Sequence, residues 1–509
     1  CNTAVYVLSR ISGEGSDRKV VPGDVLLSES EKRDILALQE MYPVFLLVLN
    51  VGGPVDLSPV VQDVDDILLL SQLGVQTGAV LSDILLGEAY PSGKLTTSWV
   101  RGGDFCPQAE FGEKEETHYK EGIYVGYRYY DAAHVKPLFP FGFGLGYTDF
   151  RLEPGAVTLA GEQVTVSAQV RNIGAFSGKE VVQLYLSSPW GALDQPAQAL
   201  AAYGKTRELA PGESCRMELR FKMSDLASFD EARSAYVLEK GDYVLRCGNS
   251  SRKCKPMALL RLTHEVVTLQ ARDLLGKPDF SDWKPEGPEP VPEGLPVYVL
   301  DAGSIPTKTL SDTRTPRPDP MVQALTDEEL VFLNIGGFKL KDRSSVVGDS
   351  GFTIPGTAGE TTSQLKAKGF PAIIMADGPA GVRLARDYYE DKKGAHSLSS
   401  AMLPTMIDLL PAPVRSSMRR QKKLPKGAVV KHRYATAIPI GTAIAQSFSL
   451  SLAESCGDIV GDEMERFGIH LWLAPALNIH RSILCGRNFE YFSEDPLVSG
   501  LTAAAITRG

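Results

Sequence analysis

The sequence predicts a multidomain protein in which two α/β regions flank an all-β region. Three observations support this: apolar runs alternate with helical stretches over residues 1–150, the pattern changes to a period of two over residues 151–265, and alternating helical and strand patterns return from residue 320. The expected fold class is therefore multidomain α/β plus all-β. It combines an αβα sandwich around a parallel sheet, a β-sandwich and part of a (β/α) barrel.

The first region, residues 1–150, reads as a partial αβα sandwich. Its three nearly uniformly apolar runs are Val5–Leu8, Val44–Leu49 and Ile67–Leu70, and Val75–Leu86 has a helical pattern. Uniformly apolar strands are typical of a doubly wound parallel sheet whose two faces are covered by helices. Loops at the carboxyl ends of such strands carry function, and Ser9–Arg18 is one of them.

The second region, residues 151–265, alternates apolar and polar side chains. The alternation is clearest in one strand, whose apolar positions are Val164, Val166, Ala168 and Val170. Short strands between Gly, Pro and Asn turns continue the pattern, which predicts a β-sandwich. Alone, such a sandwich would suggest a binding or adhesion module, but between two α/β regions we expect a packing brace.

Residues 266–319 are predicted to form an extended linker, because Gly276–Pro296 is rich in Pro, Gly and acidic residues. In residues 320–509, apolar strands are expected at Ala372–Ala376 and His470–Leu477, as in the N-terminal part of a TIM-like barrel. This last region is shorter than the ~250 residues of a closed eight-stranded barrel. We therefore expect a partial barrel.

A basic insertion, Arg415–Arg433, lies between the two expected barrel strands. Its charged positions include Arg419, Arg420, Lys422, Lys423, Lys426 and Lys431. A solvated loop is favoured over a binding patch, because no aromatic side chain interleaves with these charges.

Composition narrows the classes of function. The 509 residues, 43% hydrophobic and 23% charged, are ordinary for a globular protein of several domains. A formal net charge of -9 and a pI near 5.5 argue against nucleic-acid and anionic-membrane partners. The start CNTAVYVLSR lacks the features of a secretion signal, which favours a cytoplasmic over a secreted location. The oligomeric state is left open, a homo-oligomer included.

The cysteines are expected to be free thiols. They number seven, are widely scattered and form no C-x-x-C pair: Cys1, Cys106, Cys215, Cys247, Cys254, Cys456 and Cys485. A bridge between Cys247 and Cys254 at the end of a hairpin is the alternative. No His/Cys spacing supports a metal site, and no cofactor is expected.

The segment Leu473–Pro496, LAPALNIHRSILCGRNFEYFSEDP, carries the strongest functional signal. An apolar start predicts a buried strand, and the polar run after Asn478 is expected to emerge into solvent or a cleft. The charged residues past the strand end are Arg487, Glu490, Glu494 and Asp495. A guanidinium held by carboxylates suits a sugar pocket, because it can donate paired hydrogen bonds to hydroxyls. A surface ion-pair cluster is the alternative.

This segment resembles the barrel motif of glycoside hydrolase family 3, the family of β-glucosidases and exo-glucanases. Further segments similar to that family are MADGPAGVR at 375–383, ATAIPIGTAIAQSFS at 435–449, SRISGEGSDRK at 9–19, PSGKLTTSW at 91–99, EGIYVGYRYYD at 121–131 and FPFGFGLGYTDF at 139–150. The resemblance implies a fibronectin type III-like fold for the β-sandwich. It also implies an inverted domain order, with sheet domain and sandwich before the barrel.

The resemblance implies four site residues. Glu14, in Ser-Gly-Glu-Gly, matches the family's catalytic acid/base, a role that partial burial beside a second carboxylate would favour. Asp377 matches the aspartate that holds the 4- and 6-hydroxyls of a terminal glucose, so glucose is favoured over xylose. Arg383 and Arg487 match substrate-binding arginines. Without the resemblance, Glu14 and Asp377 would be ordinary loop and turn residues.

Retaining glycosidases need two carboxyl groups about 5 to 5.5 Å apart. The family's nucleophile lies in an S-D-W-type motif that is expected beyond Gly509, so we expect the chain to be incomplete at both ends. The triplet Ser281-Asp282-Trp283 lies in the linker and is not expected to be catalytic.

The resulting hypothesis is a retaining exo-acting β-glucosidase that hydrolyses terminal non-reducing β-D-glucosyl residues by double displacement. The expected substrate is a β-glucoside or a short β-glucan oligosaccharide. The alternatives are a β-xylosidase or mixed exo-glycosidase, and a non-catalytic carbohydrate-binding fragment.

Overall fold

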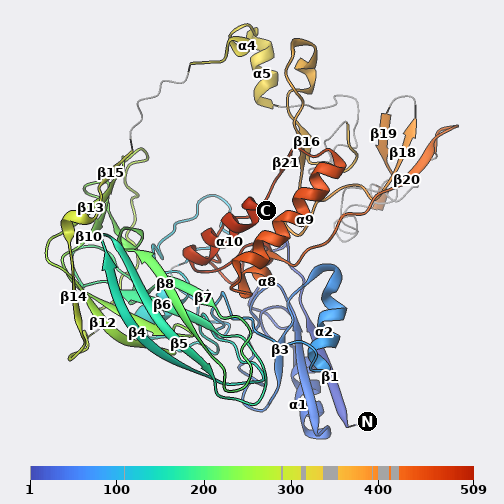
Figure 1. Ribbon diagram of the computed structural model, residues 1–509. Helices are drawn as coiled ribbons and strands as arrows, with labels where there is room; N and C mark the ends of the chain where they lie inside the picture. Colours follow the sequence, from blue (N-terminus) through green and yellow to red (C-terminus); the bar gives the residue numbers. More distant parts are fainter. Residues whose placement is uncertain are drawn as a thin grey trace. The chain divides into compact units, whose positions relative to one another are not determined.

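The computed structural model of the chain describes residues 2–107, 109–287, 290–310, 317–335, 353–391, 394–398, 412–413 and 424–509 (Figure 1). It divides into two compact units. Unit 1 comprises Cys1–Asp312, Ile440–Ala453 and Leu477–Ala504, and unit 2 comprises Thr313–Pro439, Glu454–Ala476 and Ala505–Gly509. Segments near the C-terminus therefore belong to both units.

The first region of unit 1 is built on a parallel sheet, as predicted. Its strands β1 (Thr3–Ser9), β2 (Val44–Asn50) and β3 (Ile67–Leu69) are hydrogen-bonded in the order β1-β2-β3. The helices are α1 (Glu29–Met41), α2 (Thr77–Leu85) and α3 (Tyr127–Ala132), with η1 (Gly74–Gln76) before α2. Ser28 begins α1 with a capping box to Glu31, which satisfies backbone N–H groups of the first turn.

One face of β1 is more open than the uniformly apolar pattern predicted. Ile35 of α1 and Leu47 of β2 are fully buried. By contrast, Val5 and Val7 of β1 are 43% and 48% exposed. Side chains alternate between the two faces of a strand, so the described helices cover only the other face of β1.

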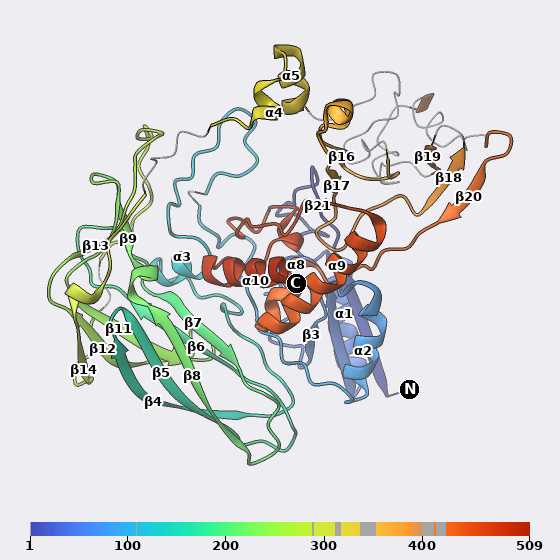
Figure 2. The same cartoon turned by 45° about the horizontal axis from the view of Figure 1, so that its top comes forward.

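The second region of unit 1 is a β-sandwich of three sheets (Figure 2). The first sheet contains β4 (Phe150–Ala160), β5 (Gln163–Asn172) and β8 (Ser214–Lys222). The second sheet contains β14 (Val297–Leu300), β12 (Cys254–Leu262), β11 (Gly241–Gly248), β6 (Val181–Ser187) and β7 (Ala199–Lys205). The third sheet contains β15 (Lys308–Thr309), β13 (Val266–Gln270), β10 (Ala235–Leu238) and β9 (Ser228–Asp230). Two short 3-10 helices, η2 (Met223–Leu226) and η3 (Ala302–Ser304), lie between the strands. The predicted alternation is confirmed, since Val164, Val166 and Val170 are fully buried.

The expected linker is not simply extended. Three of its segments, β13, β14 and β15, pair with the sandwich, and β14 and β15 do so in parallel with β12 and β13. The Pro-rich stretch also contacts the first region: the ring of Trp283 lies 4.9 Å from that of Tyr124 and 5.0 Å from that of Tyr129. The sequence did not indicate these strands or this aromatic packing, because the many prolines and glycines nearby are typical of an extended linker. The triplet that contains Asp282 is therefore part of this packing.

Buried polar contacts join the sandwich to the first region. Lys94 and Glu180 form an ion pair of 2.8 Å with side chains only 7% and 8% exposed, and Lys94 also donates to the carbonyl of Gly144. Gln198 donates to the Asp131 carboxylate at 2.8 Å. Because buried charges and amides need fixed partners, these contacts set the position of the sandwich on the first region.

Unit 2 contains a short mixed sheet. It is formed by β16 (Gly359–Glu360), β17 (Ile374–Ala376) and β21 (Leu471–Trp472), with β17 and β21 parallel. The sheet β19-β18-β20 comprises Gly394–Ser397, Asp387–Asp391 and Val429–His432. The helices of unit 2 are α4 (Pro320–Gln323), α5 (Asp327–Ile335) and most of α9 (Leu450–Phe467), with η4 at Ser363–Lys368. Unit 1 contains α8 (Gly441–Gln446), η5 (Asn488–Glu490) and most of α10 (Pro496–Arg508).

The predicted strand at His470–Leu477 is largely wrong. Only Leu471–Trp472 form a strand, and Leu473 and Leu477 are 48% and 64% exposed. An apolar run cannot distinguish a buried strand from an irregular segment. In the basic insertion, Lys431 lies in β20 beside Glu390, whereas Arg419, Arg420, Lys422 and Lys423 lie outside the described residues.

The six described cysteines are free thiols, so Cys247 and Cys254 are not bridged; Cys1 lies outside the described residues. Burial raises the pKa of the Cys247 thiol to about 12. Among the helices that the structure describes, none is both long and apolar enough to cross a bilayer. Across the described ranges, no His, Cys, Asp and Glu side chains gather in a metal-binding group.

The buried ion pair leads to the first prediction. In Lys94→Met the Glu180 charge stays buried without its cation, so the free energy of unfolding should fall by about 3 to 5 kcal/mol, measured by urea unfolding. The double variant Lys94→Met/Glu180→Leu should recover most of this loss. Arg216→Met is the control, because the contact of Arg216 with Glu218 is exposed, and it should change stability by less than about 0.5 kcal/mol. An equally small change in Lys94→Met would contradict the prediction.

Candidate active site

Glu14 lies in a tight turn after β1. The amide of Ser16 donates to the carbonyl of Gly13 at 2.9 Å, and Gly15 has a φ of +69°, which favours glycine. Arg18 anchors the following residues: its buried guanidinium donates to the Asp24 carboxylate at 2.9 Å and to the carbonyl of Pro54 at 2.5 Å. The turn is thus held at its base while Glu14 projects from its tip.

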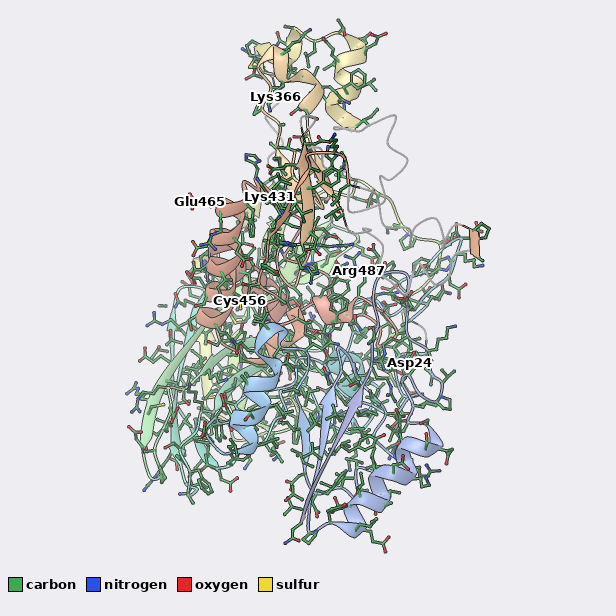
Figure 3. The ribbon with its side chains drawn as sticks, turned by 90° about the vertical axis from the view of Figure 1, so that its right-hand side faces the viewer. Asp24, Lys366, Lys431, Cys456, Glu465 and Arg487 are labelled. Carbon is green, nitrogen blue, oxygen red and sulfur yellow. The ribbon has the colours of Figure 1, made fainter. Side chains whose placement is uncertain are left out.

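Arg487, which is labelled in Figure 3, lies on a segment that packs directly against this turn. The amide of Arg18 donates to the carbonyl of Leu484 at 2.8 Å, and the amide of Gly486 donates to the Asp17 carboxylate at 2.8 Å. A Cβ at position 486 would overlap the carbonyl oxygens of Gly13 and Ser16. Only glycine allows the two backbones to approach this closely.

The close approach brings together Glu14 and Arg487, two of the four predicted site residues. Arg487 Nη1 lies 3.2 Å from Glu14 Oε1, and Arg487 Nε donates to Glu490. Burial lowers the pKa of the Arg487 guanidinium, but its hydrogen bond and charge interaction with Glu490 raise that pKa more. Arg487 is therefore a fixed cation between two carboxylates.

The described surroundings of Glu14 differ from those that would favour a proton donor. Its side chain is 79% exposed, and its charged neighbour is the Arg487 guanidinium rather than a second carboxylate. The sequence shows the glycines that make the turn but not what covers its tip.

Glu494 and Asp495 do not emerge into solvent or a cleft as predicted. They are 2% and 0% exposed. The Glu494 carboxylate accepts hydrogen bonds from the amide and hydroxyl of Ser98, at 2.8 and 2.7 Å, and from the amide of Tyr127 at 2.9 Å. Burial raises the pKa of Glu494 from 4.5 to about 7. These two residues fasten the segment to the first region rather than bind a ligand.

Asp495 also begins helix α10. Its carboxylate accepts from the amides of Leu497 and Val498 at 2.9 and 3.1 Å, while the hydroxyl of Tyr127 donates to it at 2.8 Å. An aspartate followed by a proline is a known start signal for a helix, so this capping role could have been found in the sequence.

His480 and Arg481 are further residues of this site that sequence reasoning missed. Burial lowers the pKa of His480 to about 4, so its ring is neutral near pH 7. Its Nε2 lies 2.9 Å from the carbonyl of Asn488, and its Nδ1 contacts the hydroxyl of Thr97. Nε2–H therefore donates to that carbonyl, and Nδ1 accepts from Thr97. These bonds fix the backbone close to Arg487.

Arg481 fixes the other end of the same segment. It forms a 2.6 Å ion pair with the buried Glu121 and donates to the carbonyl of Glu110 at 2.6 Å. Its guanidinium also lies 4.2 Å from the centre of the Tyr119 ring, a cation–π contact. All three partners come from the first region, so the segment that carries Arg487 is held on both sides.

The other two predicted site residues, Asp377 and Arg383, lie together in unit 2. Asp377 directly follows β17, and Arg383 Nη1 lies 3.3 Å from Asp377 Oδ2. The turn between them is tight: Gly378 has a φ of +113°, and a Cβ there would overlap the carbonyl oxygen of Gly381. Trp472 of β21 donates from its indole nitrogen to the carbonyl of Gly378 at 2.9 Å. The motif therefore forms a rigid acidic turn at a strand end.

Comparison with known proteins gives matches along most of the chain. Residues 1–147 match the glycosyl hydrolase family 3 C-terminal domain, residues 180–251 a fibronectin type III-like domain, and residues 358–509 the glycosyl hydrolase family 3 N-terminal domain. Two domain models of one family, on either side of a β-sandwich, place the sequence of the chain in the glycoside hydrolase class. The chain belongs to glycoside hydrolase family 3. The inverted domain order and the fibronectin type III-like sandwich are confirmed.

Similar proteins cover the whole chain. It is 30% identical to β-glucosidase A of Butyrivibrio fibrisolvens and 30% identical to a β-glucosidase of Ruminococcus albus, and it spans 65% and 51% of their lengths. The solved structure of a β-glucosidase from Paenibacillus barengoltzii superposes with a TM-score of 0.78 at 30% identity, over 100% of this chain and 54% of that one. The chain thus spans between about half and two thirds of these relatives.

Glu494 gives a prediction about pH. The folded protein binds this proton more tightly than the unfolded chain, so the contribution of Glu494 to the free energy of unfolding should fall as the pH rises from 4.5 through about 7. In Glu494→Gln, which cannot ionise, that slope should disappear. The stability difference between wild type and variant should therefore decrease by on the order of 3 kcal/mol between pH 4.5 and 8, measured by urea unfolding. Glu29→Gln, on an exposed helix position, is the control, and a pH-independent difference for Glu494→Gln would show the assignment to be wrong.

Proposed function

We propose that the complete protein is a retaining exo-acting β-glucosidase that hydrolyses terminal non-reducing β-D-glucosyl residues. The observation that carries the proposal is the contact between Glu14 and Arg487. Two segments 473 positions apart place an exposed carboxyl beside a fixed guanidinium. The relatives that align with the whole chain are β-glucosidases.

Glu14 acts as the acid/base in this proposal. Its carboxyl gives a proton to the glycosidic oxygen while the bond from that oxygen to the anomeric carbon breaks, and a second carboxylate forms the glycosyl–enzyme ester. Glu14 then takes a proton from the water that attacks this ester, which restores the free carboxylate nucleophile. With Glu14 as the acid/base, another carboxylate of the complete protein must be the nucleophile. The exposed tip of the turn suits a group that must reach a substrate oxygen.

The other residues bind sugar hydroxyls. Arg487 keeps its Nε on Glu490 and one Nη1–H on Glu14, so its other guanidinium N–H groups can donate to hydroxyls without loss of orientation. Asp377 accepts from the 4- and 6-hydroxyls of a terminal glucose, and Arg383 supports that carboxylate. Rigid placement of such groups lowers the entropic cost of orienting the substrate.

Replacement of Glu14 tests the catalytic assignment. Glu14→Ala in the complete protein should lower kcat/KM for an aryl β-glucoside by about 10²- to 10⁴-fold, because general acid–base catalysis is lost. Azide should restore part of kcat on a substrate with a good leaving group, since the anion attacks the glycosyl–enzyme without needing a base. A β-glucosyl azide product would demonstrate retention. Glu29→Ala, with its exposed side chain, is the control; an unchanged rate in Glu14→Ala, or an α-configured azide product, would refute the proposal.

A second comparison tests the role of Asp377. The complete protein should hydrolyse an aryl β-glucoside with a higher kcat/KM than the matching xyloside, which lacks the 6-hydroxymethyl group. Asp377→Asn should reduce that preference by about tenfold or more, because a charged acceptor loses its hydrogen bonds to hydroxyls. A wild-type preference for xylose would favour the β-xylosidase alternative.

A further inference from the structure

A groove on the β-sandwich has the composition of a ligand site. It has a volume of about 450 Å³ and lies between the loop after β6, strand β11 and the Pro-rich segment. Its lining includes Trp190, Gln195, Pro196, Asp242 and Arg246. The groove shares no residue with the candidate active site, and its size falls in the range of small-molecule sites.

The exposed side chain of Trp190 lines one side of this groove. Its side chain is 54% exposed. The carboxylate of Glu239 accepts from the amides of Ala192 and Leu193 at 2.7 and 3.3 Å, and a Cβ at Gly191 would overlap that carboxylate. These bonds hold the backbone of the loop that follows Trp190, and they leave the indole about half exposed beside the groove. Because Trp190 lines the groove, its indole offers a flat apolar face there on which a ligand can stack.

Polar groups with spare hydrogen-bonding capacity lie beside the indole. Gln195 is only 8% exposed, and within the described part of the chain its side-chain amide has no hydrogen-bond partner. Arg246 uses Nε to donate to Ser187 at 3.2 Å, which leaves its terminal nitrogens without a partner among the described residues. The Gln195 amide stays open to the groove, so it can pair there with water or with the hydroxyl groups of a ligand.

We infer that this groove binds a gluco-oligosaccharide. The C–H face of a pyranose can stack on the Trp190 ring, while its hydroxyls pair with Gln195 and Arg246. The carboxylate of Asp242 lies in the same groove and is held by Arg261 at 2.6 and 2.8 Å. A donor, an acceptor and an amide together match a neutral polyol, because each of its hydroxyl groups can both donate and accept a hydrogen bond. The choice of a glucose-based chain rests on the proposed function, and the binding itself does not.

A proline-rich peptide is the rival occupant, since such peptides dock on aromatic grooves. Pro285 and Pro290 of the chain itself already line one wall here. An added peptide would meet these rings instead of open hydrogen-bonding groups. The unpaired Gln195 amide and Arg246 nitrogens therefore favour the sugar.

Affinity electrophoresis of the complete protein in gels with soluble mixed-linkage β-glucan tests the inference, with glucose added to occupy the active site. Wild type should be retarded, and Trp190→Ala and Gln195→Leu should bind at least about tenfold more weakly, a loss of ~1.4 kcal/mol. Phe176→Ala, which removes another exposed aromatic ring of the sandwich (62% exposed), should bind like wild type. Trp190→Ala should keep the wild-type kcat for an aryl glucoside.

Three outcomes would overturn the inference. Equal retardation of wild type and Trp190→Ala shows that the groove does not bind the glucan. Retardation that disappears in Arg487→Ala but persists in Trp190→Ala assigns the binding to the active site. Binding of a proline-rich peptide, with no retardation by glucan, assigns the groove to a peptide. Failure of the proposed hydrolysis would be distinct from all three, because it would leave the retardation unchanged.

Discussion

The arrangement of unit 1 depends on the hydrogen bonds that the buried Glu494 carboxyl accepts. Three donors, two from Ser98 and one from Tyr127, converge on it from the first region. Desolvation makes its ionised form costly, and the three hydrogen bonds offset part of that cost. The carbonyl of Thr96 accepts from the hydroxyl of Ser493 and the amide of Glu494 beside it. Together these bonds fix the backbone that leads back to Arg487.

The candidate site combines rigid support with an exposed reactive group. Arg487 is oriented by the hydrogen bond that its Nε donates to Glu490, and Gly486 packs against the backbone of the Glu14 turn. Glu14 itself keeps most of its surface in solvent. Support that comes from backbone atoms and buried charges restricts where the guanidinium can go. The Glu14 carboxyl is restricted by the turn and by its contact with Arg487, and its exposed surface can still meet a substrate oxygen.

The sequence predicted the features that leave a local pattern. The alternation of apolar and polar side chains predicted β5, and the apolar runs predicted β1 and β2. The resemblance to glycoside hydrolase family 3 implied that Glu14 and Arg487 belong to one site. The roles of these two, of Asp377 and of Arg383 stay predictions. Features that depend on distant partners were missed: nothing near Glu494 in sequence shows that Ser98 will bury it, and nothing near Val297 shows that β12 will pair with it. The exposed Leu473 and Leu477 were misjudged because apolar character alone does not report burial.

The wide spacing of these partners has a consequence during synthesis. Ser98 and Glu494 are 396 positions apart. A ribosome that adds about 5 to 20 residues per second needs roughly 20 to 80 seconds to travel between them. Until Glu494 emerges, the nascent polypeptide must keep the Ser98 and Tyr127 amides hydrated or shielded by a chaperone. The portion translated early is therefore completed only when translation has nearly reached Gly509, and pausing within the intervening stretch would prolong its exposure to proteases.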